Sequence, residues 1–122
     1  MLPHTRRIFE GVAGVPRIHF GVGTGELLGV LGEAGGRRRG RRLARPPLDE
    51  AARRVGPGKA LQGNLDPAIL LAPWEVVEKK AREVLRRGAS AEGHVFNLGH
   101  GVLPSTDPDQ LKRLTDLVHE HA

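Results

Sequence analysis

The sequence predicts an α/β fold with a parallel sheet. Short apolar strands alternate with amphipathic helices, and glycine-bearing polar turns follow the strands at residues 21–25, 63–67 and 97–101. The alternation is typical of βαβ units, and polar turns at the carboxyl ends of strands are typical of the working face of a (β/α)8 barrel. A complete barrel needs about 250 residues, whereas this chain has 122. We therefore expect about half of a barrel, or a smaller open sheet.

The first quarter of the chain predicts a helix, a strand and a second helix. Residues 3–11 are expected to form a helix that ends at a glycine. Residues 15–20 predict a short strand, and the leucines and valine of residues 26–34 lie on one face of a helix. The Gly-Val-Gly-Thr-Gly loop at 21–25 fits a phosphate-binding loop poorly. Its third glycine would fall on Glu26, whose carboxylate would repel a phosphate.

The rest of the chain continues the alternation. Asp66 is expected to cap the turn that begins at Pro67, and Asp107 to cap a final helix with Pro108 at its first position. Apolar residues recur at helical spacing in residues 74–87, which makes this the most secure helix. The predicted elements are a helix at 47–56, a strand at 60–62, a helix at 74–87, a strand at 94–96 and a helix from 108.

The net charge of +5 comes from one local patch. Six arginines lie within residues 37–45, and removing their six charges takes the net charge from +5 to −1. Aromatic residues make up 3% of the chain, so stacking platforms for single-stranded nucleic acid are missing. Nucleic acid is therefore not the expected partner, although a nucleic-acid-binding fragment is kept as an alternative. The arginines are Arg37, Arg38, Arg39, Arg41, Arg42 and Arg45.

Several classes of protein and site are not expected. The chain has no cysteine, which excludes disulfides and cysteine-based zinc sites. No apolar run approaches the roughly 20 residues that span a bilayer, and no apolar core of a secretory signal follows the start. We therefore expect a cytoplasmic protein that does not contact a membrane. The remaining histidines show no metal-ligand spacing: His4, His19, His94, His119 and His121.

The turn at residues 97–101 is the strongest candidate site. It follows the apolar strand at 94–96 and has the sequence Asn-Leu-Gly-His-Gly. The glycines on both sides of His100 allow a positive φ or a close approach to a ligand. His100 is therefore expected at the tip of a strand, where α/β folds place their chemistry. The alternative is an ordinary surface histidine on a turn, and the pattern alone does not decide between them.

Three segments carry a resemblance to a known family. Gly-Val-Pro-Arg-Ile-His-Phe-Gly-Val-Gly-Thr-Gly at 14–25, Leu-Gln-Gly-Asn-Leu-Asp-Pro at 61–67 and Phe-Asn-Leu-Gly-His-Gly at 96–101 resemble the C-terminal part of the uroporphyrinogen decarboxylases. The resemblance covers nearly all of residues 1–122 and implies the C-terminal half of a (β/α)8 barrel. It implies a carbon–carbon lyase of haem biosynthesis that acts as a homodimer. Such an enzyme converts uroporphyrinogen III to coproporphyrinogen III by releasing four CO2, without cofactor or metal.

The resemblance assigns one site residue to this chain. His100 falls on the family's substrate-binding histidine, and an imidazole can offer a hydrogen bond or charge to a substrate carboxylate. The catalytic aspartate and the arginine motif belong to the missing N-terminal half, so no catalytic residue is expected here and the isolated chain should be inactive. Asp49 and Asp66 do not replace them, and Asp66 is expected to be structural. The alternative enzyme, a cobalamin-linked methyltransferase on a related barrel, would need a Cys/His zinc site, and the chain lacks cysteine.

Residues 36–46 depart from the family pattern. The family has an apolar strand close to Ala-Asp-Val-Val-Gly-Val-Asp-Trp-Arg-Val, where this chain has Gly-Arg-Arg-Arg-Gly-Arg-Arg-Leu-Ala-Arg. GC-rich codons for the family strand, read one base earlier, encode the observed residues. We therefore hypothesise an out-of-frame stretch, which resequencing of the locus tests. Six guanidinium groups cannot occupy a buried strand, so we expect this segment to be an exposed loop and one strand of the sheet to be lost. A further alternative for the protein is a non-catalytic barrel half that assembles with a separately encoded upstream half.

Overall fold

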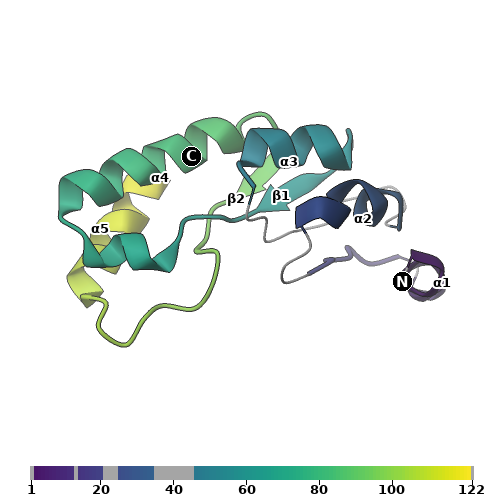
Figure 1. The fold of residues 1–122 in the computed structure, drawn as a ribbon, viewed down its shortest axis with the longest axis horizontal. Helices are drawn as coiled ribbons and strands as arrows, with labels where there is room; N and C mark the ends of the chain where they lie inside the picture. The colour runs from purple at the N-terminus through teal and green to yellow at the C-terminus, as the bar shows by residue number, and fades with distance from the viewer. Residues whose placement is uncertain (1, 13, 21–24, 35–45, 122) are drawn as a thin grey trace.

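The computed structural model describes residues 2–12, 14–20, 25–34 and 46–121 (Figure 1). Two of its elements are short 3-10 helices, labelled η. In chain order the elements are α1 (Leu2–Gly11), η1 (Gly25–Leu27), α2 (Leu28–Ala34), α3 (Leu48–Val55), β1 (Ala60–Gln62), η2 (Pro67–Leu71), α4 (Trp74–Gly88), β2 (Gly93–Val95) and α5 (Pro108–His119). The predictions that concern residues 21–24 and 35–45, which include all six clustered arginines, lie outside the described residues.

Most predicted elements form at or within a residue of their expected bounds. β1 has the predicted bounds, β2 begins one residue earlier than predicted, and α4 ends at Gly88. Both predicted caps are confirmed. The Asp66 carboxylate accepts a hydrogen bond from the backbone N–H of Ala68, and the Asp107 carboxylate accepts one from Asp109, each at 2.9 Å.

The strand predicted at residues 15–20 is wrong. This segment has no strand partner among the described residues, and its polar side chains bind helix α1 instead. Arg17 donates a hydrogen bond to the Phe9 carbonyl and lies over the Phe9 ring, while His19 meets the same ring edge-on at 5.5 Å between centroids. Ile18 and Phe20 are left 57% and 58% exposed. A strand needs a neighbouring ladder, and here the alternating apolar side chains have no sheet to join.

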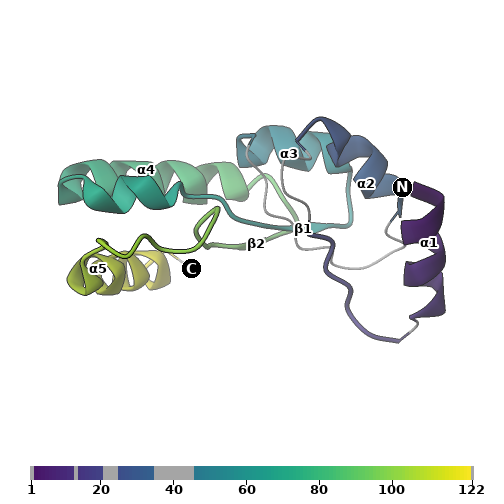
Figure 2. The ribbon, with the colours of Figure 1, turned by 60° about the horizontal axis from the view of Figure 1, so that its bottom comes forward.

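A two-stranded parallel sheet stands at the centre of the described structure. β1 and β2 pair in parallel, with Leu61 opposite His94. Helices α2, α3 and α4 lie along one side of this pair, and α5 lies beside α4 (Figures 1 and 2). The predicted α/β class is confirmed. Across the described ranges the sheet has two strands, fewer than half of a barrel would hold.

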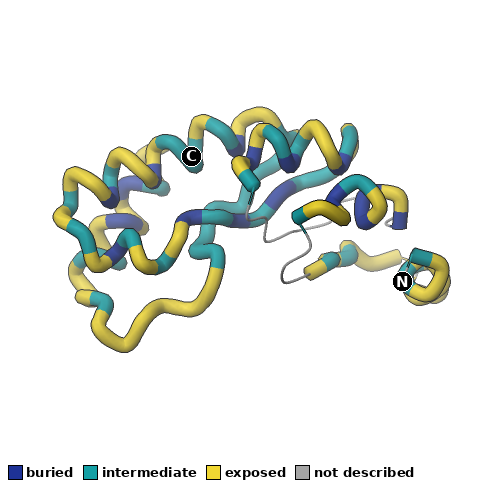
Figure 3. Tube along the Cα trace, in the orientation of Figure 1, coloured by how far each residue is buried: buried dark blue, intermediate teal, exposed yellow. Residues whose placement is uncertain are grey.

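Two apolar clusters attach the helices to the strands. Leu61, fully buried, points from β1 into the first cluster, and Val77 of α4 is buried in the second. Val84 packs against both clusters and joins them. The first cluster contains Leu28, Leu48, Ala51, Val55 and Leu61, and the second contains Leu65, Leu70, Val77, Ala81, Leu114 and Leu117. In Figure 3 the buried positions lie on the elements that contribute to these two clusters. No described residue before Leu28 is buried.

Ion pairs cover the outer faces of α3 and α4. Glu78 accepts hydrogen bonds from the Arg82 guanidinium at 2.7 and 2.9 Å, four residues along α4. Glu50 of α3 does the same with Arg53 and Arg54. These bonds lower the pKa of both carboxyl groups below the ordinary value of 4.5, because they favour the charged form.

Acid should weaken α4 through the Glu78–Arg82 pair. The pKa of Glu78 is lower in the folded chain, so its contribution is fully present above the ordinary value of 4.5 and is lost as the pH falls through the lowered pKa. We expect the urea midpoint to fall between about pH 6 and about pH 3, and Glu78→Gln to flatten this dependence. Glu75→Gln in the same helix is the control, because Glu75 has no ion pair among the described side chains. Equal pH profiles for wild type and Glu78→Gln would contradict the assignment.

Candidate functional site

The two polar turns that follow β1 and β2 lie side by side. The backbone N–H of Gly63 donates to the Val95 carbonyl at 3.0 Å, and Leu65 donates to Asn97 at 3.2 Å. Gly99 donates back to the Leu65 carbonyl at 2.7 Å. The parallel pairing therefore continues past both strands, and it brings the two glycine turns together at one edge as their position at strand ends predicted.

His94 holds the first turn in place. Gly63 has a φ of +136°, a conformation that favours glycine, and its carbonyl accepts a hydrogen bond from His94 Nε2 at 2.7 Å. A carbonyl only accepts, so this contact puts the ring proton on Nε2. The Nδ1 side of the ring faces Gly88 at the end of α4, where a Cβ would overlap it. From the sequence His94 was placed in the strand at 94–96 and found to lack metal-ligand spacing, so this positioning role was missed. The available signal was the glycine that closes the preceding helix, Gly88.

His100 lies where the sequence predicted it, exposed at the end of the second turn. Its position depends on the backbone, because the preceding residue Gly99 is hydrogen-bonded to Leu65. Within the described part of the chain the His100 side chain has no hydrogen-bond or ion-pair partner. The imidazole is thus placed by a fixed turn while both of its ring nitrogens remain available to a ligand.

The asparagines of the two turns differ in their contacts. Asn64 Nδ2 donates to the Pro46 carbonyl at 2.8 Å, which ties the first turn to the chain before α3. The Asn97 side-chain oxygen is buried and has no hydrogen-bond partner among the described residues. A buried acceptor of this kind needs an N–H or O–H donor. Asn97 was not singled out from the sequence, although it stands in the turn that was.

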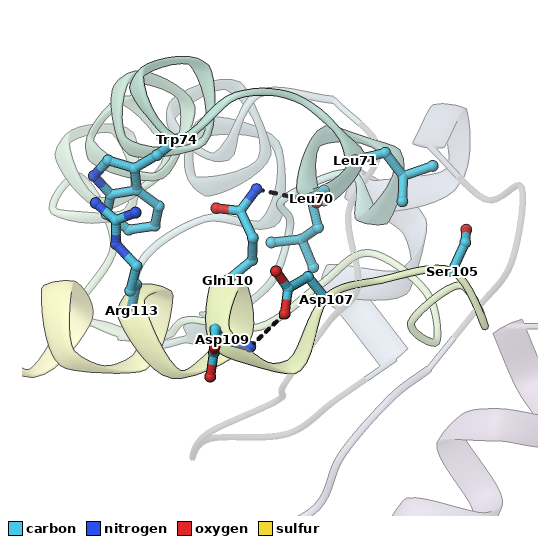
Figure 4. A pocket seen from close by; sticks show the side chains of 8 residues that line it. All are labelled: Leu70, Leu71, Trp74, Ser105, Asp107, Asp109, Gln110 and Arg113. Carbon is cyan, nitrogen blue, oxygen red and sulfur yellow. Dashed lines mark hydrogen bonds between the residues drawn. The ribbon is translucent and has the colours of Figure 1, made fainter.

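A shallow pocket of about 340 Å³ lies elsewhere, between η2, α4 and α5 (Figure 4). The Arg113 guanidinium lies 4.2 Å from the centre of the Trp74 ring, and Gln110 donates to the carbonyls of Leu70 and Ala72 at 3.3 and 2.8 Å. These contacts join the three elements, and His100 does not line the pocket. The lining residues are Leu70, Leu71, Trp74, Ser105, Asp107, Asp109, Gln110 and Arg113.

Asp66 and Asp49, neither of which was expected to be catalytic, make contacts within the fold. Asp66 caps η2, and the Asp49 carboxylate lies 3.5 Å from the Arg87 guanidinium. Within residues 2–12, 14–20, 25–34 and 46–121, no three His, Cys, Asp or Glu side chains are grouped to hold a metal ion. In the same ranges no helix has both the length and the apolar character to span a membrane.

Comparison with known proteins relates nearly the whole chain to one protein family. The family model "Uroporphyrinogen decarboxylase (URO-D)" matches residues 1–121. This chain is 69% identical to the uroporphyrinogen decarboxylase of Streptomyces coelicolor and 62% identical to that of Thermobifida fusca. Each match covers 98% of this chain, but 34% and 33% of the two relatives respectively. The chain thus spans about a third of these relatives, less than the predicted half.

One solved structure has the same fold. A methyltransferase from Methanosarcina mazei superposes with a TM-score of 0.77 over 98% of this chain and 35% of its own, at 17% identity. That identity supports a shared fold and nothing about activity. Neither the methyltransferase alternative nor the nucleic-acid alternative is favoured by the high identities to decarboxylases. The chain belongs to the uroporphyrinogen decarboxylase family, whose fold is a (β/α)8 barrel.

Proposed function

We propose that this chain supplies one wall of the tetrapyrrole site of a uroporphyrinogen decarboxylase, with His100 as a substrate-binding residue. The observation that carries the proposal is the paired turns beyond β1 and β2, which hold an exposed His100 at the carboxyl end of parallel strands. The family match gives the substrate class that such a histidine would meet.

The proposed reaction converts uroporphyrinogen III to coproporphyrinogen III in four equivalent steps. In each step the bond between an acetate methylene and its carboxylate breaks, CO2 leaves, and a proton takes its place to give a methyl group. A ring N–H of His100 would donate to a substrate carboxylate and hold it in register. The group that stabilises the developing charge is expected outside this chain, as the family resemblance implies. The isolated chain should therefore form no coproporphyrinogen.

Replacing His100 should weaken substrate binding in a complete barrel. The test enzyme is the Streptomyces coelicolor decarboxylase with its matching segment exchanged for residues 46–121 of this chain. His100→Ala should raise KM by about tenfold to a hundredfold with a smaller change in kcat, because a hydrogen bond to a charged group contributes about 1.5–3 kcal/mol. His119→Ala, an exposed histidine of α5, is the control. An unchanged KM for His100→Ala in an active chimera would refute the role of His100.

Four further features remain predictions from the sequence. They are the cytoplasmic location, the homodimer, the absence of a required cofactor or metal, and the exposed loop at residues 36–46. Mass measurement and activity after treatment with a chelator test the homodimer and the metal independence of the chimera.

A further inference from the structure

The side chains of β2 and of the turn after it alternate between two faces. The His94 ring lies against Gly88 of α4, and Phe96 and Leu98 pack against the second apolar cluster. These side chains therefore point to the side that the helices cover (Figure 2). Successive side chains of an extended chain point to opposite faces, so Asn97 points away from the helices. In a (β/α)8 barrel the helices lie outside the strands, and the face opposite them is the interior.

The amide of Asn97 has no partner in the fold. Its Oδ1 atom is buried and accepts no hydrogen bond, and its Nδ2 group donates none among the described residues. An enclosed acceptor without a donor destabilises a folded chain. The fold bears this cost at the carboxyl end of a parallel strand, where barrels bind their ligands. Such a combination indicates that the amide serves a ligand rather than the fold.

The neighbouring strand carries a second asparagine at the same level, and it behaves differently. Leu65 forms a parallel bridge with Leu98. The residues before them, Asn64 and Asn97, therefore lie opposite each other in the two turns. Asn64 Nδ2 donates to the Pro46 carbonyl at 2.8 Å, so the Asn64 amide is used inside the fold. The chain thus holds two asparagines at matching positions, and it uses one of them itself.

We propose that Asn97 binds substrate beside His100, with its Nδ2 group donating a hydrogen bond to a carboxylate of the tetrapyrrole. The proposal rests on the proposed function, which supplies the substrate class. Because the Oδ1 atom is enclosed by the chain itself, the N–H groups are the part of the amide left for a ligand. N–H groups pair with acceptors, and a carboxylate oxygen is the strongest acceptor that this substrate class offers.

The backbone holds Asn97 and His100 on one turn, three residues apart. This turn is fixed by the bond from the Gly99 N–H to the Leu65 carbonyl at 2.7 Å. Two donors on one fixed turn can hold two carboxylates of the same tetrapyrrole. Such a pair sets the orientation of the substrate as well as its affinity. Asn97 is neutral, so it selects a carboxylate by direction and leaves the charge to the imidazole.

The first test measures binding and stability on the decarboxylase chimera that carries residues 46–121 of this chain. Asn97→Leu should raise KM by about tenfold to a hundredfold with a smaller change in kcat, because a hydrogen bond to a charged group is lost. Its urea midpoint should equal or exceed that of the unsubstituted chimera, because an unpaired polar atom has been removed. Asn64→Leu is the matched control for stability. It loses the bond to the Pro46 carbonyl, so its midpoint should fall.

The second test concerns the chemistry of the contact. Asn97→Asp keeps nearly the same shape but replaces the N–H donors with an oxygen that only accepts. A carboxylate at this position would face a substrate carboxylate, and like charges repel. Asn97→Asp should therefore raise KM further than Asn97→Leu does. A KM for Asn97→Asp at or below that of Asn97→Leu would refute the carboxylate as the acceptor.

Two further results would overturn the proposal. An unchanged KM for Asn97→Leu would refute the contact. A urea midpoint that falls for Asn97→Leu as it does for Asn64→Leu would make Asn97 a structural residue. His100→Ala in the same chimera separates the two proposals. If His100→Ala raises KM and Asn97→Leu does not, this inference fails alone, whereas unchanged KM values for both in an active chimera would refute the proposed function as well.

Discussion

Replacing Leu61 with alanine is expected to lower the free energy of unfolding by about 2–5 kcal/mol. Leu61 is fully buried in β1 and lies in the first apolar cluster with Leu28, Leu48 and Val55. Removing three carbons there leaves a cavity between the strand and three helices, and neighbours attached to separate elements cannot close it fully. A loss of this size is a large part of the total stability of a small domain.

Urea denaturation followed by circular dichroism measures the effect of Leu61→Ala. Leu71→Ala is the matched control, because Leu71 is 52% exposed in η2 and the same atoms are removed. The control should shift the midpoint by a few tenths of the Leu61→Ala shift or less. Equal midpoints for Leu61→Ala and wild type would show that β1 does not pack against α2 and α3 as described.

Replacing Gly88 with alanine is expected to destabilise the chain by about 1–3 kcal/mol, although alanine is the better helix former. A Cβ at Gly88 would overlap the His94 ring, and the ring cannot swing away without losing its 2.7 Å hydrogen bond to the Gly63 carbonyl. Gly11→Ala is the control. Gly11 lies at the end of α1, and a Cβ added there would meet no atom within 4 Å, so this substitution should be neutral or slightly stabilising.

A double-mutant cycle separates overlap from helix propensity. In a His94→Ala background the ring is gone, so Gly88→Ala should cost at least about 1 kcal/mol less than in wild type. In the decarboxylase chimera, Gly88→Ala should also disturb the turn at Gly63, seen as a chemical-shift change at Leu65 and Gly99. Additive effects of the two substitutions would mean that His94 does not join α4 to the strand-end turn.

The elements from residue 26 onward and the position of the candidate turn were predictable because they depend on local chemistry. Each signal spans only a few neighbouring residues. The signals are proline and aspartate at helix starts, glycine at helix ends and the 3.6-residue apolar period of α4. The Asn-Leu-Gly-His-Gly turn is equally local, so the exposed position of His100 was predictable, while its substrate-binding role stays a prediction.

The failed strand at residues 15–20 shows where local reading stops. Its apolar alternation is that of a strand, yet a strand exists only where a neighbour completes its ladder. Instead Arg17 and His19 bind the ring of Phe9, eight and ten residues earlier. No pattern within the segment distinguishes these outcomes, because they differ in what lies next to it.

The positioning of the site also belongs to the tertiary structure. The contacts that hold it join residues about thirty apart, such as His94 with Gly63 and Gly99 with Leu65. By itself the sequence determined the α/β class, the caps, the family and the exposed position of His100 on a strand-end turn, since each is carried by a short run of residue types. Only the folded chain decided that His94 supports the first turn, that Asp49 lies beside the Arg87 guanidinium, and that Ile18 and Phe20 are exposed, because those outcomes depend on which distant surfaces meet.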